Sequence, residues 1–393
     1  MIFDTFFYYF VILVPSAIAF RLVAPALRPW ICVTFGAVFF LYFSLTQLGG
    51  VPGAACLSLF FWEACFSRLY KPRSRWCIAG IVQAIGILFV FKYWNFFAGL
   101  FVGSAPESPV FWRGAFLPLG ISFFTFEFIH FAADRYRGTA KAGTFGEYLA
   151  FILFFPTMVA GPIKRFQDFV PKLQSPSKNW ALDWHRGVTR ILAGLVKKFA
   201  IADLLGAWTI NLNHGAIALA DRRVLPLWLL AYGIKIYIDF SAYSDIAIGS
   251  ARLFGIRVPE NFDWPYLRRN ITEFWRHWHI SLSRWLMDYV YIPLGGSRVS
   301  SPRIYGNIIL TMLISGLWHG AGLNFIAWGL WHGCLLAGHR LWRKNRPVGN
   351  QEPSLLGSAL SWALTFLLVN LGWAFFCMDF PTALFFFRRL LLG

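Results

Sequence analysis

The side chains that can exchange a proton near neutral pH are concentrated toward the end of this chain. Five of its eight histidines lie in the last third of the sequence. Four of these five fall in two segments, EFWRHWHISLSRW at 273–285 and SGLWHGAGLNFIAWGLWHG at 315–333. Imidazole titrates near physiological pH and is the most frequent general acid or base, so any chemistry is expected in these segments first.

His319 stands between Trp318 and Gly320 inside a strongly apolar run. A neutral imidazole buried there must be hydrogen-bonded, or its burial is costly. From the residues alone, a core histidine with satisfied hydrogen bonds and a catalytic general base explain His319 equally well. His332 repeats the Leu-Trp-His-Gly context near a basic cluster that begins at Arg340, and a structural role is favoured there.

The earlier segment is polar for so apolar a chain. Arg276 and Arg284 alternate there with histidines and tryptophans. Arg pairs bidentately with phosphate and Trp covers apolar groups, so this surface could hold the phosphate of phosphopantetheine or coenzyme A. An interfacial helix with snorkelling arginines and a tryptophan belt explains the same pattern, and the residues alone favour it.

Several other kinds of site are not supported. His277 and His279 would point about 200° apart on a helix, and no HExxH or further Cys/His set accompanies them, so no metal site is expected. The six cysteines show no CxxC spacing and read as small core residues. The chain has no GxSxG, GxxxxGKS or GxGxxG motif, which argues against a serine hydrolase, an ATP-driven pump and a dehydrogenase.

The elements that must position these residues are membrane spans. The chain is 58% hydrophobic, 19% aromatic and 14% charged, whereas soluble domains are roughly half apolar and a quarter charged. Its 36 Lys and Arg exceed its 18 Asp and Glu, but they come in twos and threes between apolar runs. This pattern orients spans, and it predicts contact with anionic lipid headgroups and no nucleic-acid partner.

Apolar runs separated by short loops predict the spans. Loop charges place the N-terminus outside and the first, third and fifth connections in the cytoplasm. The run at 148–160 is too short to cross and predicts a re-entrant or interfacial segment, and 163–187 predicts cytoplasmic surface helices. The remaining apolar runs lie at 5–20, 29–46, 52–66, 77–101, 114–133, 188–210, 224–256, 304–318, 321–338 and 354–377.

Charged residues interrupt two of the later runs. Lys197 and Lys198 lie within 188–210, and Asp239 and Asp245 lie within 224–256. Ionisable groups at membrane depth are costly unless they face protein, water or each other. The interruptions therefore indicate a polar cavity inside the bundle.

Eight ordered motifs resemble the membrane-bound O-acyltransferase family, most closely its alginate O-acetylase branch and more distantly the teichoic-acid D-alanyl transfer proteins. The resemblance covers about 90–385. The motifs are LPLGISFFTFEFIHFAADRYRG (117–138), FFPTMVAGPIKRF (154–166), GLVKKFAIAD (194–203), YIDFSAYSDIAIG (237–249), ENFDWPY (260–266), EFWRHWHISLSRW (273–285), YVYIPLGG (289–296) and SGLWHG (315–320).

The resemblance implies an all-α, polytopic bundle of about nine to eleven spans with re-entrant or interfacial helices, forming one membrane domain over 1–393. It implies a multi-pass O-acyltransferase of the cytoplasmic (inner) membrane, without a bound cofactor. An acyl group, most simply acetyl, would pass from a cytoplasmic thioester, acetyl-CoA or an acyl carrier, to a hydroxyl outside. The acceptor would be an envelope polysaccharide or a periplasmic partner protein that carries the acyl group onward.

The resemblance also assigns the histidines. His319 matches the essential histidine of the family, and His279 matches its second conserved histidine. Residues expected to line the substrate path, or alternatively to form a polar packing cluster, are Asp239, Tyr243, Asp245, Asn324 and Trp318. Residues expected to bind the donor are Arg276, Arg284, Lys197 and Lys198.

The chain departs from the family pattern at three positions. His277 and Met287 stand where relatives commonly carry Arg, and Ala242 stands where Gly is usual. The two lost arginines predict altered donor contacts, and His277 is left out of the catalytic set. The chain also ends sooner than alginate O-acetylases generally do, so we expect a streamlined enzyme whose acceptor need not be alginate.

Three alternatives stay open at the level of the sequence. The first is D-alanyl-type transfer to a cell-wall polymer. The second is a transporter for a small anion or lipid-linked intermediate, although no inverted repeat is found. The third is a non-enzymatic scaffold of a polysaccharide export complex.

Overall fold

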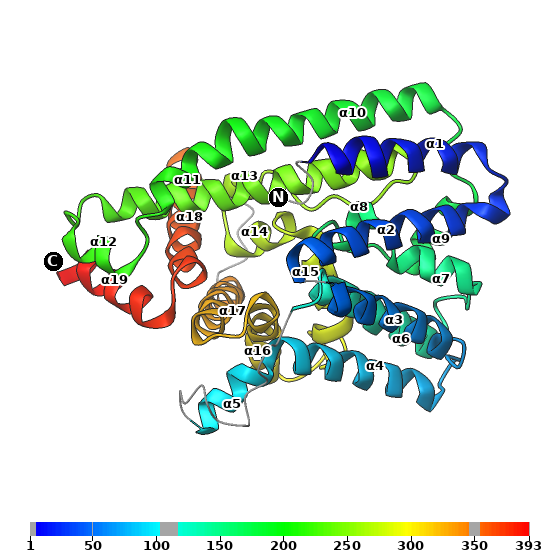
Figure 1. Cartoon of the computed structure of the whole chain (residues 1–393). Helices are drawn as coiled ribbons and strands as arrows, with labels where there is room; N and C mark the ends of the chain where they lie inside the picture. Colours follow the sequence, from blue (N-terminus) through cyan, green and yellow to red (C-terminus); the bar gives the residue numbers. More distant parts are fainter. Residues whose placement is uncertain (1–4, 49, 103–116, 346–353, 393) are drawn as a thin grey trace. The chain divides into compact units, whose positions relative to one another are not determined.

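The computed structural model describes residues 5–48, 50–102, 117–345 and 354–392, and every regular element in them is a helix (Figure 1). This confirms the all-α prediction. Contacts divide the chain into unit 1, Met1–Leu195 with Ala242–Pro259, and unit 2, Val196–Ser241 with Glu260–Gly393. Helix α13 (Leu225–Leu253) contributes to both units. The single membrane domain stays a prediction.

Unit 1 is built from helices that pack through aromatic side chains. Phe60 lies edge-on to Phe40 and to Phe124, with ring centroids 5.1 and 4.9 Å away. The helices are η2 (Phe7–Leu13), α1 (Val14–Leu22), η3 (Pro25–Leu27), α2 (Arg28–Leu48), α3 (Gly50–Ser67), α4 (Arg75–Leu88), η4 (Phe89–Tyr93), α5 (Trp94–Val102), α6 (Ile121–Arg137), α7 (Phe145–Ile152), α8 (Phe155–Met158), α9 (Phe166–Gln174) and α10 (Trp180–Val196).

Three stretches in the described residues are long and apolar enough to cross a membrane: Pro25–Thr46, Arg75–Phe101 and Leu355–Cys377. The run at 148–160 instead falls within the short helices α7 and α8 and the residues around them, as its length predicted. The start of the predicted run at 114–133 lies outside the described residues. The total of nine to eleven spans stays a prediction.

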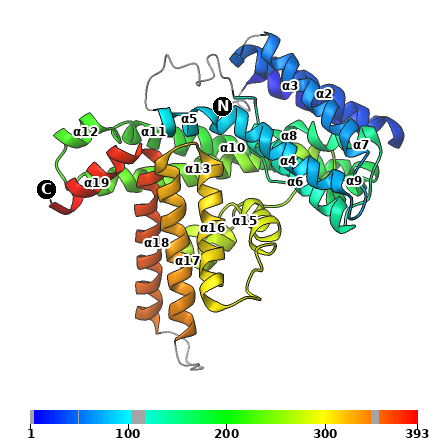
Figure 2. The same ribbon diagram turned by 90° about the horizontal axis from the view of Figure 1, so that it is seen from below.

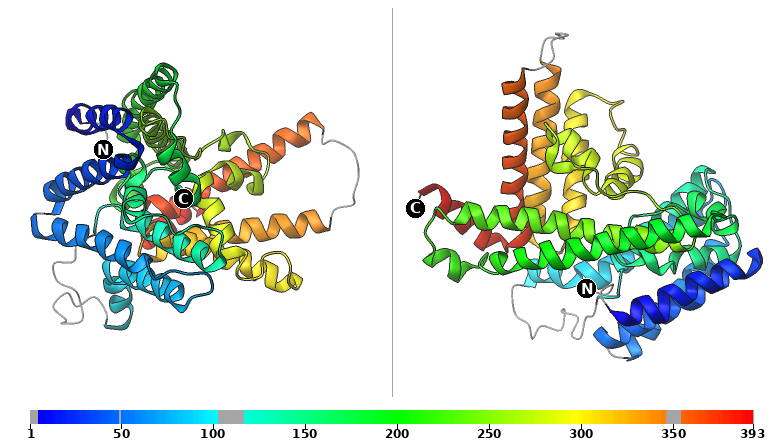
Figure 3. Two further views of the ribbon diagram at one scale, coloured as in Figure 1. Left: turned by 90° about the vertical axis from the view of Figure 1, so that its right-hand side faces the viewer. Right: turned by 90° about the horizontal axis from the view of Figure 1, so that it is seen from above.

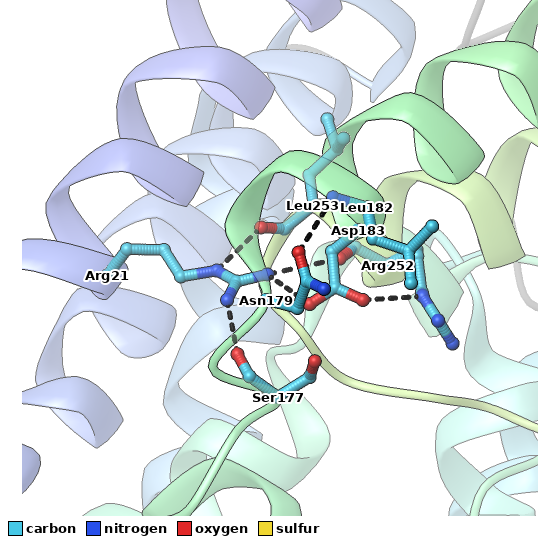
Figure 4. Close-up of polar contacts among 7 residues, drawn as sticks. All are labelled: Arg21, Ser177, Asn179, Leu182, Asp183, Arg252 and Leu253. Carbon is cyan, nitrogen blue, oxygen red and sulfur yellow. Dashed lines mark hydrogen bonds and ion pairs between the residues drawn. The ribbon is translucent and has the colours of Figure 1, made fainter.

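A buried charge cluster holds three parts of unit 1 together (Figure 4). The Arg21 guanidinium, at the end of α1, contacts Asp183 in the first turn of α10 at 3.0 Å. It also donates to the carbonyl oxygens of Leu253 and Ser177. Arg252 contacts the other oxygen of Asp183 at 2.8 Å. The two ends of unit 1, far apart in sequence, are therefore joined by one carboxylate between two arginines.

Two further buried carboxylates of unit 1 are also matched by partners. Lys164 donates to Glu127, and both side chains are nearly inaccessible. Glu63 accepts from the hydroxyl of Tyr70 at 2.8 Å and from the amide of Gln83 at 2.7 Å. These ionisable groups therefore face each other rather than lipid, as their cost in a membrane requires.

Unit 2 contains a row of three long helices, α16 (Ser301–His319), α17 (Leu323–Lys344) and α18 (Leu355–Cys377), which run side by side (Figures 2 and 3). The other helices that lie wholly in unit 2 are shorter. They are η5 (Lys197–Ala202), α11 (Asp203–Thr209), α12 (His214–Leu219), η6 (Pro265–Leu267), α14 (Ile271–His277), α15 (Ile280–Leu286), η7 (Met287–Tyr291) and α19 (Phe380–Leu392). Of these, α14, η7 and α19 contact the row.

Candidate active site

His319 is the last residue of α16, and glycines let the next helix approach it closely. A Cβ on Gly316 would lie 2.2 Å from the carbonyl oxygen of Phe325, and one on Gly329 would lie 2.5 Å from that of Met312. Real Cβ atoms do not come so close, so α16 and α17 can pack at this distance only because both positions are glycine. The glycines of the sequence motif thus fix where His319 stands.

Three aromatic rings surround His319. Trp318 lies at 4.8 Å, Phe376 of α18 at 5.0 Å and Trp328 of α17 at 5.2 Å between ring centroids, all in edge contact. His319 itself is partly exposed. We call these three side chains, Trp318, Trp328 and Phe376, the aromatic collar.

His279 lies at a break between two short helices. Helix α14 ends at His277, α15 begins at Ile280, and His279 adopts the left-handed conformation with φ 42°. A non-glycine residue in this region is strained, and such strain is found preferentially at functional sites. The segment is therefore not one helix, and the expected 200° separation of His277 and His279 does not apply.

Hydrogen bonds accepted by Asn261 hold this break in place. The backbone N–H of Ile280 donates to the Asn261 carbonyl oxygen at 2.9 Å, and the Ser281 hydroxyl donates to the Asn261 side chain at 2.6 Å. The His279 ring is buried, 4.7 Å from Phe240 and 6.1 Å from Trp318 between centroids. Since Trp318 also contacts His319, the structure gathers the two predicted histidines around one indole ring.

His277 faces other partners. Its Nδ1 lies 2.7 Å from the Glu273 carbonyl oxygen, and its Nε2 lies 3.5 Å from the Asp263 carboxylate. These contacts tie His277 to the backbone of its own helix and to Asp263, and its omission from the catalytic set stays a prediction. No group of three or more His, Cys, Asp or Glu side chains that could hold a metal ion occurs in the described ranges.

The predicted donor and channel residues overlap in space. Lys198 contacts Asp239 at 3.0 Å and Asp203 at 2.7 Å, while Lys197 donates to the Ser241 hydroxyl at 2.9 Å. Lys198, expected to bind the donor, is thus matched by Asp239, which was expected to line the substrate path. Two carboxylates already neutralise this ammonium, so it is a weaker anion site than the sequence alone indicated.

The other predicted residues are distributed between the units. Tyr243 and Asp245 belong to unit 1, where Asp245 contacts Arg190 at 2.9 Å. In unit 2, Asn324 donates to the Phe375 carbonyl oxygen at 3.2 Å and ties α17 to α18. Arg276 of α14 and Arg284 of α15 are exposed.

The sequence did not single out Trp328 and Phe376. Trp328 follows His319 by nine residues and gave no signal beyond its aromatic character. Phe376 comes from the last long helix, and only the packing of α18 places it against His319. Both contacts depend on helix packing and not on any local motif.

Fold and site together define a helical membrane protein with a histidine in an aromatic collar at the end of a helix. The family model of the membrane-bound O-acyltransferases matches residues 39–370, and the chain belongs to this family. This confirms the resemblance and extends it toward the N-terminus. With the apolar helices, it makes the chain a multi-pass membrane protein.

The chain is similar to curated proteins of at least three kinds. The chain is 44% identical over 315 residues to a probable alginate O-acetylase AlgI of Pseudomonas aeruginosa, covering 78% of this chain and 58% of the relative. It is 34% identical over 338 residues to a peptidoglycan O-acetyltransferase of Helicobacter pylori, covering 77% and 61%. It is 33% identical over 251 residues to a teichoic acid D-alanyltransferase of Streptococcus thermophilus, covering 61% and 60%. The chain thus spans less than two thirds of the length of these relatives.

Proposed function

We propose that the chain is an O-acyltransferase that moves an acetyl group from a cytoplasmic thioester to a hydroxyl of an envelope polysaccharide, with His319 as the general base. The observation that carries this proposal is the partly exposed imidazole at the end of α16, held by close glycine contacts inside the collar. The similarity to two kinds of bacterial O-acetyltransferase supports the acetyl group and the inner membrane.

The reaction requires one proton to be moved twice. As the acceptor oxygen attacks the thioester carbonyl carbon, His319 takes the hydroxyl proton, and a tetrahedral oxyanion forms. When the C–S bond breaks, the imidazolium returns the proton to the leaving thiolate, so that an ester and a free thiol result. General base catalysis of this kind contributes about 10² to 10⁴ in rate.

His279 is proposed to donate a hydrogen bond to the oxyanion. Neither of its ring nitrogens bonds to another residue in the described part of the chain, so a donor is available. Asn261 accepts bonds that hold the backbone after His279, and Phe240 and Trp318 pack against the His279 ring, so the ring is positioned before substrate arrives, which is the property that oxyanion stabilisation needs.

The donor phosphates are proposed to bind at Arg276 and Arg284. Both guanidinium groups are exposed on the short helices that flank His279. Lys198 is less suited because Asp203 and Asp239 already neutralise it. The donor is thus an acyl thioester that carries phosphate, acetyl-CoA or a phosphopantetheine carrier, and no resident cofactor is needed.

The test is acyl transfer by the purified membrane protein. Labelled acetyl-CoA is supplied with polysaccharide or with a candidate periplasmic acceptor protein, and ester formation is measured for wild type, His319→Ala and His185→Ala. His185 is an exposed histidine of α10 and serves as the matched control. We expect transfer by wild type and His185→Ala alone. Equal transfer by folded His319→Ala would overturn the assignment.

D-alanyl transfer is the second candidate, because the chain also resembles teichoic acid D-alanyltransferases. The same assay distinguishes it when D-alanyl carrier protein replaces acetyl-CoA. Transfer of D-alanine without transfer of acetate would replace the first proposal by the second.

A further inference from the structure

Three nitrogen-bearing rings meet next to His319, and one of them, Trp328, also belongs to the collar. Trp275 of α14 and Trp328 and His332 of α17 form a triangle whose centroids are 4.9 to 5.6 Å apart. We call this set the indole box. Phe274 and Trp373 cover it, with centroids 6.5 and 6.4 Å from that of His332. The box is thus walled by aromatic rings.

The polar atoms of the indole box are buried and have no protein partner. The exposed fractions are 8% for Trp275, 1% for Trp328 and 0% for His332. Among the described residues, neither indole nitrogen and neither imidazole nitrogen has a hydrogen-bond partner. Two N–H donors and an imidazole that can both donate and accept are therefore gathered in one apolar place.

Such a cluster is costly unless something satisfies it. A buried donor without a partner pays its full desolvation penalty, and natural proteins usually meet such groups with internal water that makes two to four hydrogen bonds. A phenylalanine at 332 would carry no ring nitrogen that needs a hydrogen-bond partner. The presence of histidine beside two unmatched indoles thus indicates a small polar molecule that forms hydrogen bonds with all three side chains.

We propose that the indole box binds a buried water molecule that accepts hydrogen bonds from Trp275 and Trp328 and is held by His332. His332 is then a positioning residue, because the water fixes the Trp328 indole, which in turn lies edge-on to His319 at 5.2 Å and 81°. The catalytic part of this inference rests on the proposed role of His319; the binding of water does not.

The packing around His332 leaves little freedom for the ring. A Cβ at Gly372 of α18 would lie 2.9 Å from His332 Nε2. The glycine therefore lets α18 approach the imidazole closely on one side, while Trp328 contacts it at 4.9 Å between centroids. Small displacements near reacting groups matter, because a shift of about 1 Å can cost about 10²-fold in rate.

The first test compares a stability change in two backgrounds. His332→Phe keeps a ring and removes both nitrogens. Because the larger phenyl ring also overpacks the site beside Gly372, the substitution is made both in wild type and in a Trp275→Phe/Trp328→Phe background. If the box held no water, His332→Phe would change the melting temperature equally in both backgrounds. If water is bound, Trp275 and Trp328 lose their shared acceptor only in wild type, and we expect the melting temperature to fall further there, with an intermediate fall for His332→Asn. An equal change in both backgrounds would overturn the proposal.

The second test is a double-mutant cycle. We expect Trp328→Phe and His332→Phe each to lower kcat by about tenfold with unchanged KM for the donor, and the double variant to lose about tenfold rather than a hundredfold. Trp331→Phe, which removes an indole donor bonded to Leu368 outside the box, is the control and should combine additively with His332→Phe. Additive behaviour of the Trp328 pair would contradict a shared water.

Both tests remain informative if a variant or the mechanism fails. Trp275→Phe with Trp328→Phe gives the same cycle without altering position 332. The cycle is also measured by thermal unfolding in the His319→Ala background, where no turnover is needed. If the substitutions change the melting temperature non-additively but leave kcat unchanged, water is bound but His332 has no positioning role. If neither readout shows coupling, the whole inference is wrong.

Discussion

Two buried carboxylates of unit 1 and two buried histidines of unit 2 meet different kinds of neighbour. In unit 1 the buried carboxylates meet cations or hydroxyls, as Asp183 meets Arg21 and Glu127 meets Lys164. In unit 2 the buried nitrogens of His279 and His332 meet aromatic rings and no protein hydrogen-bond partner within the described residues. Paired groups stabilise a fold, whereas unmatched polar groups are available to a ligand or a reacting atom, so we expect these two carboxylates to serve the fold and these two histidines to serve the proposed chemistry.

Replacement of His319 is expected to have the largest effect, which is on catalysis and not on the stability of the fold. His319→Ala should lower kcat by about 10² to 10⁴-fold, because general base catalysis is lost. The melting temperature should stay close to that of wild type, since the ring is partly exposed. Turnover and thermal unfolding measured on one preparation separate the two effects. If the activity of His319→Ala falls only in proportion to its folded fraction, His319 serves the fold and not the chemistry.

Substitutions in the Lys164 and Glu127 pair are expected to change stability without changing activity. Lys164→Met leaves a buried carboxylate alone, and we expect a loss of about 3–5 kcal/mol in the free energy of unfolding. The double variant Lys164→Met/Glu127→Leu should recover most of that loss, because no charge is left unpaired. Activity per folded molecule should stay near wild type in both. A specific loss of kcat in the stable double variant would give this pair a role in chemistry.

The Asp183 cluster predicts a pH dependence of stability. Burial would raise the pKa of Asp183, but hydrogen bonds from Ser177 and Arg21 and the charges of Arg252 and Arg21 outweigh burial and place the pKa below its usual value. A carboxylate with a lowered folded pKa stabilises the fold above its unfolded pKa of about 3.9, and this contribution is lost as the pH falls through the folded pKa.

The lowered pKa of Asp183 predicts how a substitution there changes stability with pH. Asp183→Asn should be less stable than wild type at neutral pH by about 1.5–3 kcal/mol, the range for hydrogen bonds to charged groups. Wild type should lose this advantage below about pH 4, so that the two unfolding curves converge in acid. Curves that stay parallel from pH 7 to pH 3 would show that the cluster does not titrate as proposed.

The smallest effect concerns the glycines that set the site. Gly316→Ala should cost about 1–3 kcal/mol through overpacking against the Phe325 carbonyl oxygen, and it should also lower kcat because His319 moves. Gly338→Ala on α17 is the matched control, since nothing lies within 4 Å of its added Cβ. There the helix should gain up to about 1 kcal/mol with unchanged activity. Unfolding and kcat for both variants provide the comparison.

Much of the fold followed from local patterns. The apolar runs at 304–318 and 321–338 became α16 and α17, and the run at 354–377 became α18 with almost the same bounds. A run of about 20 apolar residues predicts both the length of a helix and its location in a membrane, so this prediction needs no tertiary information. The break at His279 was missed, because the left-handed conformation of one residue leaves no mark on hydrophobic periodicity.

The sequence by itself determined that the chain enters a membrane, that it is helical, and that His279 and His319 are the residues to test. Composition, run length and ordered motifs carry that information, because each is a property of consecutive residues. Only the tertiary structure decided that Phe376 joins the collar, that Lys198 is neutralised by Asp239, and that Trp275 meets His332 in the indole box. These contacts join residues far apart or on different helices, and which side chains meet is set by how closely the helices pack, as the glycines of α16 and α17 show.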